Sequence, residues 1–266
     1  MVGLNIYIIS LKNSPRRKLQ EKQFSKLGLD FEFLDAISKD EVSNEEALHA
    51  KWERPLHLSE IACYKSHRNA WEKTASSNIP SLILEDDALI SNKLPKIIRN
   101  ISSQRNSDYI NLENRNRKKI VSKKQISLDL NDNFSMLRLY HDSTGAAGYI
   151  LYPKGAKKII ACESQYGLAL ADAQISRCNS LVKFQVEPAL IVQLDMANTY
   201  GIKTRKKSLQ LSQSTVSTSK KPAKSLNYLI KRITSQFKLG ARKIYLSFFT
   251  ERRYINTAPR DSFFLS

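Results

Sequence analysis

The chain is poor in cysteine and has no long apolar run. Of its 266 residues only three are cysteines, Cys63, Cys162 and Cys178, and they are widely spaced and odd in number. Neither a disulfide framework nor a CxxC metal site is therefore expected. No stretch reaches the roughly 18 apolar residues of a membrane span, and the apolar residues 4–11 lack the flanks of a signal peptide. These absences predict a cytosolic chain that is neither secreted nor membrane-spanning.

Acidic residues are scarce near the C-terminus. Residues 203–266 hold 15 lysines and arginines against two acids, so they carry +13 of the formal net charge of +18. Residues 203–225 are rich in serine, threonine and lysine, which predicts a flexible basic linker. Residues 1–202 have a composition typical of one globular domain.

Residues 226–266 are predicted to form a basic, helical, membrane-associating tail. Between residues 226 and 248, apolar side chains recur at spacings of three and four, and basic side chains occupy the other face. Gly240 weakens this helix in its middle. An anionic membrane surface attracts such a helix by about 1 kcal/mol per basic residue. The alternative is that the apolar stripe packs on the preceding domain or on a partner subunit, which leaves a homo-oligomer open.

Strand and helix patterns alternate along residues 1–202, which predicts an α/β fold with a mixed, mainly parallel sheet. Strands are expected at residues 4–11, 31–37, 80–84, 108–112 and 145–152, and two more within 181–194, separated at Pro188. Helices are expected at residues 15–27, 58–77, 94–104 and 153–162, with Ser14 and Ser59 as N-caps of the first two and Gly28 ending the first. The polar and basic residues 113–132 are expected to form a loop.

Three consecutive acids, Glu85, Asp86 and Asp87, follow the apolar strand at residues 80–84. In an open α/β sheet, ligands gather beyond the carboxyl ends of the strands. Because neighbouring anions repel each other, a divalent cation would stabilise them; Mg²⁺ and Mn²⁺ prefer oxygen ligands and can in turn hold a diphosphate. The acid-x-acid pattern therefore predicts a nucleotide-sugar transferase. An acidic turn without a ligand would give the same pattern.

Five segments in this order resemble glycosyltransferase family 25, whose members extend bacterial lipooligosaccharide or modify animal collagen. They are "YIISLKNSPRRKLQ" (7–20), "FEFLDAI" (31–37), "LSEIACYKSHRNAW" (58–71), "SLILEDDALI" (81–90) and "GAAGYILYPKGAKKII" (145–160). The resemblance covers about residues 4–195. It implies a GT-A fold, an inverting transfer from a UDP-sugar, often UDP-galactose, and a divalent metal. It also implies a lipid-linked oligosaccharide acceptor, hence a place on the inner face of the bacterial inner membrane.

The resemblance also implies roles for individual residues. The expected donor-binding residues are Ser10, Arg16, Arg17, Ser66, His67, Glu85 and Asp86. Asp87 is expected to contact the metal most directly. Glu85 is a second metal candidate, expected nearer the ribose or held through water, and His141 is a third. The two arginines are placed to meet diphosphate oxygens, although basic residues in a first helical turn are often merely exposed. A lone helical histidine is usually structural, so that reading of His67 stays open beside a donor-site role, and Trp71 is expected in the core.

An inverting transfer also needs a carboxylate that takes the proton of the acceptor hydroxyl. The family carries an acid after the helix that follows residues 145–152, and here "LALADAQI" offers Asp172, without the proline that often precedes it. Asp142 is the alternative base, and either acid could instead be a loop or helix-cap residue.

Two other classes of protein would explain part of the sequence. A nucleic-acid-binding protein would explain the charge, but the basic excess is separate from the α/β body and no nucleic-acid module is recognisable. A non-catalytic membrane-recruitment module would explain the tail but leaves the acids after the strand without a role. A glycosyltransferase that binds no nucleic acid accounts for both features.

Overall fold

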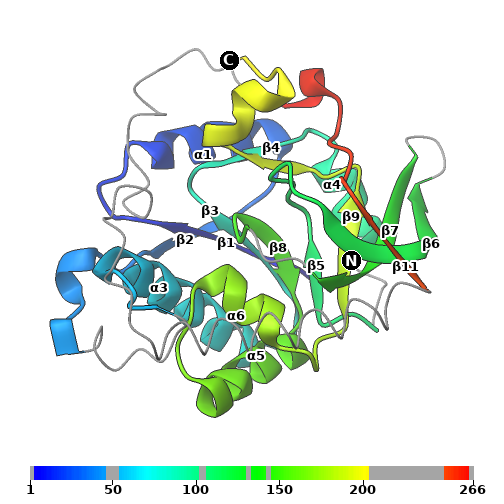
Figure 1. Cartoon of the computed structure of the whole chain (residues 1–266). Coiled ribbons are helices and arrows are strands. Elements are labelled where there is room, and N and C mark those ends of the chain that lie inside the picture. The colour runs from blue at the N-terminus through cyan, green and yellow to red at the C-terminus, as the bar shows by residue number, and fades with distance from the viewer. Residues whose placement is uncertain are drawn as a thin grey trace.

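The computed structural model describes residues 3–45, 54–101, 106–129, 133–141, 145–203 and 249–263, and these form a large sheet with helices on both faces (Figure 1). The strands are β1 (Asn5–Ser10), β2 (Glu32–Asp35), β3 (Ser81–Glu85), β4 (Ala88–Ile90), β5 (Tyr109–Asn111), β6 (Lys119–Asp129), β7 (Phe134–His141), β8 (Gly148–Leu151), β9 (Lys183–Glu187), β10 (Ile191–Gln193) and β11 (Thr250–Arg253). The α-helices are α1 (Arg16–Leu27), α3 (Leu58–Ala75), α4 (Leu94–Ile101), α5 (Pro153–Tyr166) and α6 (Ala171–Arg177), and the short 3-10 helices are η1 (Lys39–Glu41), η2 (Leu194–Tyr200) and η3 (Arg260–Ser262).

The sheet is mixed, but it is not mainly parallel. Its strand order is β11-β6-β7-β9-β5-β8-β3-β1-β2, and β4 pairs separately with β10. β1 runs parallel to β2 and β3, and β5 runs parallel to β9. The other five pairs of the large sheet are antiparallel. The predicted parallel character is wrong outside these pairs, because β8 enters between β3 and β5 in the opposite direction and β6 and β7 form an antiparallel hairpin.

Two apolar layers enclose the sheet, and alternate residues of each strand contribute to opposite layers. Ile6 and Ile8 of β1 pack in the cluster that contains residues of α1 and α4. Tyr7 and Ile9 pack in the cluster that contains residues of α3, α5 and α6. Figure 1 shows the corresponding helices on opposite sides of the strands. Helices on both faces therefore hold β1 and its neighbours in position.

The predicted elements of the first half are largely confirmed. β1, β2, β3 and α1 form where their patterns place them, and Gly28 ends α1 with φ +63°, a left-handed conformation that favours glycine. The N-caps differ from expectation. Pro15 caps α1, with the Ser14 hydroxyl accepting the Arg16 N–H, and His57 rather than Ser59 caps α3.

The predicted loop at residues 113–132 is wrong, because Lys119–Asp129 forms the long strand β6. Residues 123–127 are exposed, so this stretch lacks the alternation of apolar and polar side chains that identifies a half-buried strand. Pairing with β7 on one side and β11 on the other stabilises it. Tertiary pairing rather than local pattern therefore determines β6.

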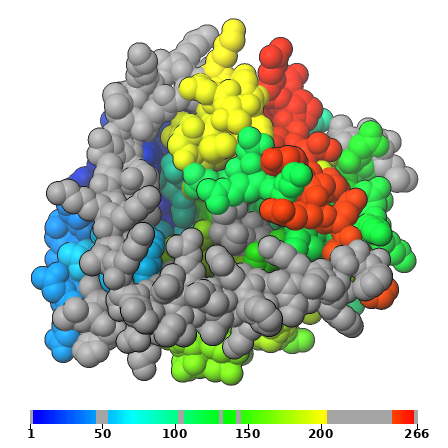
Figure 2. All heavy atoms as spheres, viewed as in Figure 1, coloured from blue at the N-terminus to red at the C-terminus, as the bar shows by residue number. Residues whose placement is uncertain are grey.

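Residues 249–263 belong to the sheet domain. β11 pairs with β6, and Arg253 Nη1 donates to Glu187 Oε1 at 2.7 Å. Ile255, Ala258 and Phe263 are buried in the two apolar layers. Figure 2 shows this segment, in red, against β6 and beside η2 on the surface.

The last part of the predicted tail 226–266 is thus a strand and an ordered segment, because its backbone completes one side of the sheet. The predicted linker 203–225, apart from Lys203, and the predicted amphipathic helix at 226–248 lie outside the described residues. In the part of the chain that the structure describes, no helix combines the length and the apolar character needed to cross a bilayer.

Candidate active site

The acids after β3 lie at an edge where three strands end together. β1, β2 and β3 are parallel, with Ile9 beside Glu85 and Ser10 beside Asp35 in the sheet register. Asp86 and Asp87 form the turn between β3 and β4. The position beyond the carboxyl ends of parallel strands, predicted from the sequence, is where the structure has these carboxylates.

Asp86 is the centre of a hydrogen-bonded group that joins β1 to α1. Its Oδ2 accepts the hydroxyls of Ser10 at 2.8 Å and Ser14 at 2.7 Å, and its Oδ1 accepts Arg16 Nη1 at 3.1 Å. Gln20 of α1 donates to the backbone oxygen of Asp86 at 2.8 Å. The structure therefore brings Ser10, Arg16 and Asp86 together, and the carboxylate fixes the direction of the guanidinium.

Glu85 ends a chain of buried hydrogen bonds that begins on α3. Trp71 Nε1 donates to the Tyr149 hydroxyl at 2.8 Å, so the Tyr149 proton is available for His67 Nδ1 at 2.9 Å. The neutral imidazole then carries its proton on Nε2, which donates to Glu85 Oε1 at 3.0 Å. Gln193 Nε2 donates to Glu85 Oε2 at 3.0 Å. His67 thus orients Glu85, and Trp71 is a core residue, as expected.

Glu85 and Asp87 have opposite pKa shifts although they are two residues apart. Burial raises the pKa of Glu85, but the hydrogen bond from His67, the Arg115 guanidinium and the Gln193 amide together outweigh burial and bring this pKa below its usual value. Burial, then the Glu85 carboxylate, raises the pKa of Asp87 to about 8, against the lowering effect of Arg16. Glu85 is therefore the ionised member of the pair at neutral pH.

Asp87 has an unused ligand atom. Its Oδ1 is buried and has no hydrogen-bond partner among the described residues. An ionised carboxylate in that position requires a counter-charge, and a hard divalent cation would supply it. The residues present therefore fit Mg²⁺ or Mn²⁺ held through Asp87, whereas Asp86 already accepts three donors.

Glu113 is a buried acid that the sequence reasoning missed. It lies just after β5, a position similar to that of Glu85 at the end of β3. Its Oε2 accepts the backbone N–H of Ala147 at 2.8 Å. Burial, then the Glu85 carboxylate, raises the pKa of Glu113 to about 8. A side chain at Gly145 would collide with it, since a Cβ there would lie 2.5 Å from Oε2. The rule that identified Glu85, an acid directly after an apolar strand, would also have identified Glu113.

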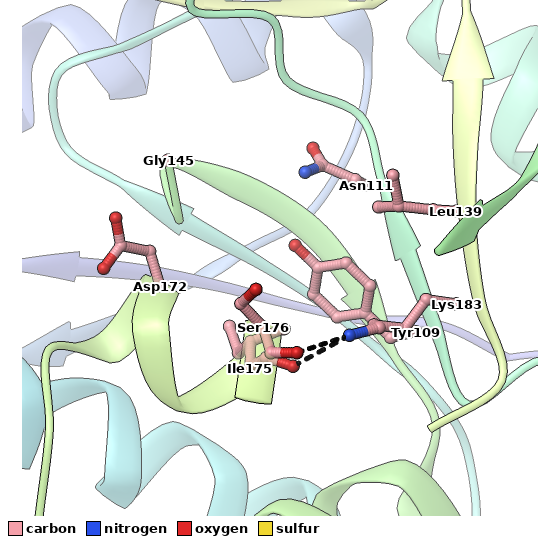
Figure 3. Close-up of a pocket in the computed structure, with 8 residues that line it drawn as sticks. All are labelled: Tyr109, Asn111, Leu139, Gly145, Asp172, Ile175, Ser176 and Lys183. Carbon is pink, nitrogen blue, oxygen red and sulfur yellow. Dashed lines mark hydrogen bonds between the residues drawn. The ribbon is translucent and has the colours of Figure 1, made fainter. Parts of the chain in front are cut away.

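Asp172 lines a pocket between α6 and the strands β5, β7 and β9 (Figure 3). Its lining comes from β5, β7, α6, β9 and the segment before β8: Tyr109, Asn111, Leu139, Gly145, Asp172, Ile175, Ser176 and Lys183. Asp172 lies in the first turn of α6, where its Oδ1 accepts the Ala173 N–H at 2.7 Å. Burial raises the pKa of the Cys63 thiol, and the carboxylates of Glu85, Asp172 and Asp87 raise it further. Asp172, Glu85 and Asp87 therefore act on one shared neighbour, the Cys63 thiol.

Other predicted residues have partners elsewhere. Arg17 donates to the backbone oxygens of Leu11 and Ser10, pairs with Asp35 and stacks on Phe33. Ser66 accepts the Ile37 N–H at 2.9 Å and donates to Ala62 O at 2.7 Å, so its hydroxyl joins α3 to the segment after β2.

The two remaining candidates lie near the end of β7. His141 is half-buried and pairs with Ile120, and it is absent from the group of close metal-ligand atoms found among the described residues. Asp142 lies outside the described residues. The roles predicted for these residues stay predictions.

Comparison with known proteins identifies the family of the chain. A model of glycosyltransferase family 25 (LPS biosynthesis protein) matches residues 4–175, and the chain therefore belongs to this family. The predicted family is confirmed, and membership supports glycosyltransferase activity.

Two relatives illustrate the range of the family. The chain is 27% identical over 272 residues to the lipooligosaccharide biosynthesis protein lic2B of Haemophilus influenzae, a match that covers 94% of this chain and 97% of that protein. It is 28% identical over 174 residues to a glycosyltransferase 25 family member of Drosophila melanogaster, covering 59% of this chain and 28% of the fly protein.

Proposed function

We propose that the chain is an inverting glycosyltransferase of GT-A type that moves a sugar, galactose in the first instance, from a UDP-sugar to a lipooligosaccharide glycan with the help of Mn²⁺ or Mg²⁺. The observation that carries the proposal is the buried Oδ1 of Asp87, which has no hydrogen-bond partner among the described residues, at the carboxyl edge of a family 25 domain. The identity of the donor rests on the family resemblance, and that of the acceptor on the name of the Haemophilus relative.

The donor would lie over the turn between β3 and β4. A bound cation there would supply positive charge to the leaving diphosphate. Arg16, held by Asp86, would contribute a second positive charge. His67 and Gln193 hold both oxygens of Glu85, so this carboxylate would accept a ribose hydroxyl or a water in a fixed direction.

The acceptor would enter the pocket that Asp172 lines. The reacting hydroxyl of the acceptor would reach the Asp172 carboxylate there. Lys183 Nζ donates to the backbone oxygens of Ile175 and Ser176 and thereby holds α6 against β9 (Figure 3). Asp172 would take the proton of the acceptor hydroxyl as that oxygen attacks the sugar.

The membrane role belongs to the same proposal. The sequence of residues 226–248 predicts a basic amphipathic helix, and a lipid-linked acceptor would require the enzyme at the inner face of the inner membrane. Attraction to anionic lipid would bring the sheet domain to its acceptor.

A panel of UDP-sugars tests the proposed reaction. We expect UDP release from one of them, UDP-galactose first, only with Mn²⁺ or Mg²⁺ present, and loss of release with a chelator. Addition of a short soluble lipooligosaccharide fragment is expected to convert hydrolysis into transfer. Failure to release UDP from every UDP-sugar, with both metals present and the chain folded, would contradict the proposal.

A further inference from the structure

Three side chains with different metal-binding atoms meet at the end of β3. Cys63 and His67 are one helical turn apart on α3, and Glu85 ends β3 opposite them. One ligand atom of each lies within 4.8 Å of the other two, and His67 Nε2 is 3.0 Å from Glu85 Oε1. In the described part of the chain these are the three that form such a group.

The histidine ring is already held as in metal sites. Tyr149 contacts Nδ1 at 2.9 Å and in turn accepts Trp71 Nε1 at 2.8 Å, and all three side chains are buried. Metal-binding histidines usually have their second nitrogen hydrogen-bonded in this way, which fixes the ring and its tautomer. If Nε2 binds a metal, the ring proton moves to Nδ1 and the Tyr149 oxygen, which has two lone pairs, accepts it together with that of Trp71. The Tyr149 O–H then no longer has Nδ1 as its acceptor, while the imidazole keeps one hydrogen bond to the Tyr149 oxygen.

The ligand set selects a different metal from the one expected at Asp87. A thiolate, an imidazole and one carboxylate oxygen suit Zn²⁺, whereas Mg²⁺ and Mn²⁺ prefer sites made of oxygen ligands. Glu85 would bind through Oε1 and could keep Gln193 on Oε2. Three protein ligands leave the fourth position of a tetrahedral ion open to water.

We propose that Cys63, His67 and Glu85 form a Zn²⁺ site that is separate from the hard-cation position at Asp87. On binding, the thiol proton and the Nε2 proton are displaced, the first to solvent and the second in exchange for a proton on Nδ1. The site shares Glu85 with the proposed donor site, so Zn²⁺ binding would inhibit transfer. Zn²⁺ binding itself does not depend on the proposed function.

Cobalt substitution gives a direct readout of this site. Full-length metal-free chain titrated with Co²⁺ is expected to develop thiolate-to-cobalt charge-transfer absorption, and one equivalent of Zn²⁺ is expected to remove it. Cys63→Ser should abolish this absorption, while Cys162→Ser, at a buried position on α5, should retain it. Tyr149→Phe removes the hydroxyl on His67 and is expected to weaken Zn²⁺ binding by about 10–100-fold while the cobalt absorption remains.

A second measurement covers the case in which Cys63→Ser does not fold. Zn²⁺ should protect Cys63 of the parent chain from alkylation, located by mass spectrometry, and Mg²⁺ should not. Absence of charge-transfer absorption in the folded parent, its persistence in folded Cys63→Ser, or equal alkylation with and without Zn²⁺ would overturn the proposal. UDP release with Mn²⁺ is measured separately, so failure of the zinc site and failure of the proposed reaction are distinguishable.

Discussion

Replacement of Glu113 by glutamine tests whether the fold holds a second acid of the site in its neutral form. Glu113 is 1% exposed, and burial followed by the Glu85 carboxylate raises its pKa to about 8 from an ordinary value of 4.5. Between these two values the folded chain retains a proton that the unfolded chain has lost. The free energy of unfolding of the parent therefore decreases as pH rises through this window, by up to about 1.4 kcal/mol per pH unit from this group.

Glutamine is neutral at every pH and keeps an oxygen for the Ala147 N–H. The difference in unfolding free energy between Glu113→Gln and the parent is thus expected to increase with pH, in favour of the variant, and to reach a few kcal/mol at pH 8. Urea unfolding at pH 5, 6, 7 and 8 measures it. Glu21→Gln, at an exposed position on α1, is the matched control and should run parallel to the parent. A pH-independent difference for Glu113→Gln, or one of opposite sign, would refute the reasoning.

Three further outcomes are expected. Arg253→Ala leaves the buried Glu187 with the Asn256 N–H and should cost about 3 kcal/mol, or a fall in Tm of roughly 6–12 °C, whereas the exposed Arg252→Ala should melt like the parent. Asp172→Asn should lower turnover by about 10²–10⁴ with UDP binding unchanged; near-parental turnover would move the role to another acid such as Asp142. Replacing residues 204–248 by a Gly/Ser linker, which retains β11, should remove salt-sensitive binding to anionic vesicles while UDP release persists. If the parent and this variant sedimented equally with vesicles at both low and high salt, that result would argue against the membrane role.

The choice of this excision follows from what the sequence could and could not predict. β1, β3 and α1 were predictable, because apolar alternation, Pro15 and Gly28 are local signals. β11 has the sequence "TERR", which carries no strand signal, and it forms because β6 offers it a pairing edge. Removal of residues 203–266 would therefore strip buried side chains from the core and confuse loss of folding with loss of membrane binding.

The candidate site divides in the same way. The position of Glu85, Asp86 and Asp87 at a strand end followed from a short apolar run and its neighbours. The different environments of the three carboxylates could not be predicted from the sequence. They depend on Arg16, His67 and Gln193, which the fold brings from α1, α3 and β10. Sequence order gives the edge of the sheet at which an acid lies, whereas its pKa and free ligand atoms depend on contacts between distant segments.

Calorimetric titration of the full-length chain with UDP, with and without Mn²⁺, tests the central claim most directly. Asp87→Asn keeps the shape of the side chain but removes the anionic oxygen, and Asp40→Asn at the exposed turn η1 is the matched control. The account predicts Mn²⁺-dependent UDP binding in the parent and in Asp40→Asn, and its loss in folded Asp87→Asn. Mn²⁺-dependent binding of parental affinity in Asp87→Asn would contradict the assignment of the metal to Asp87.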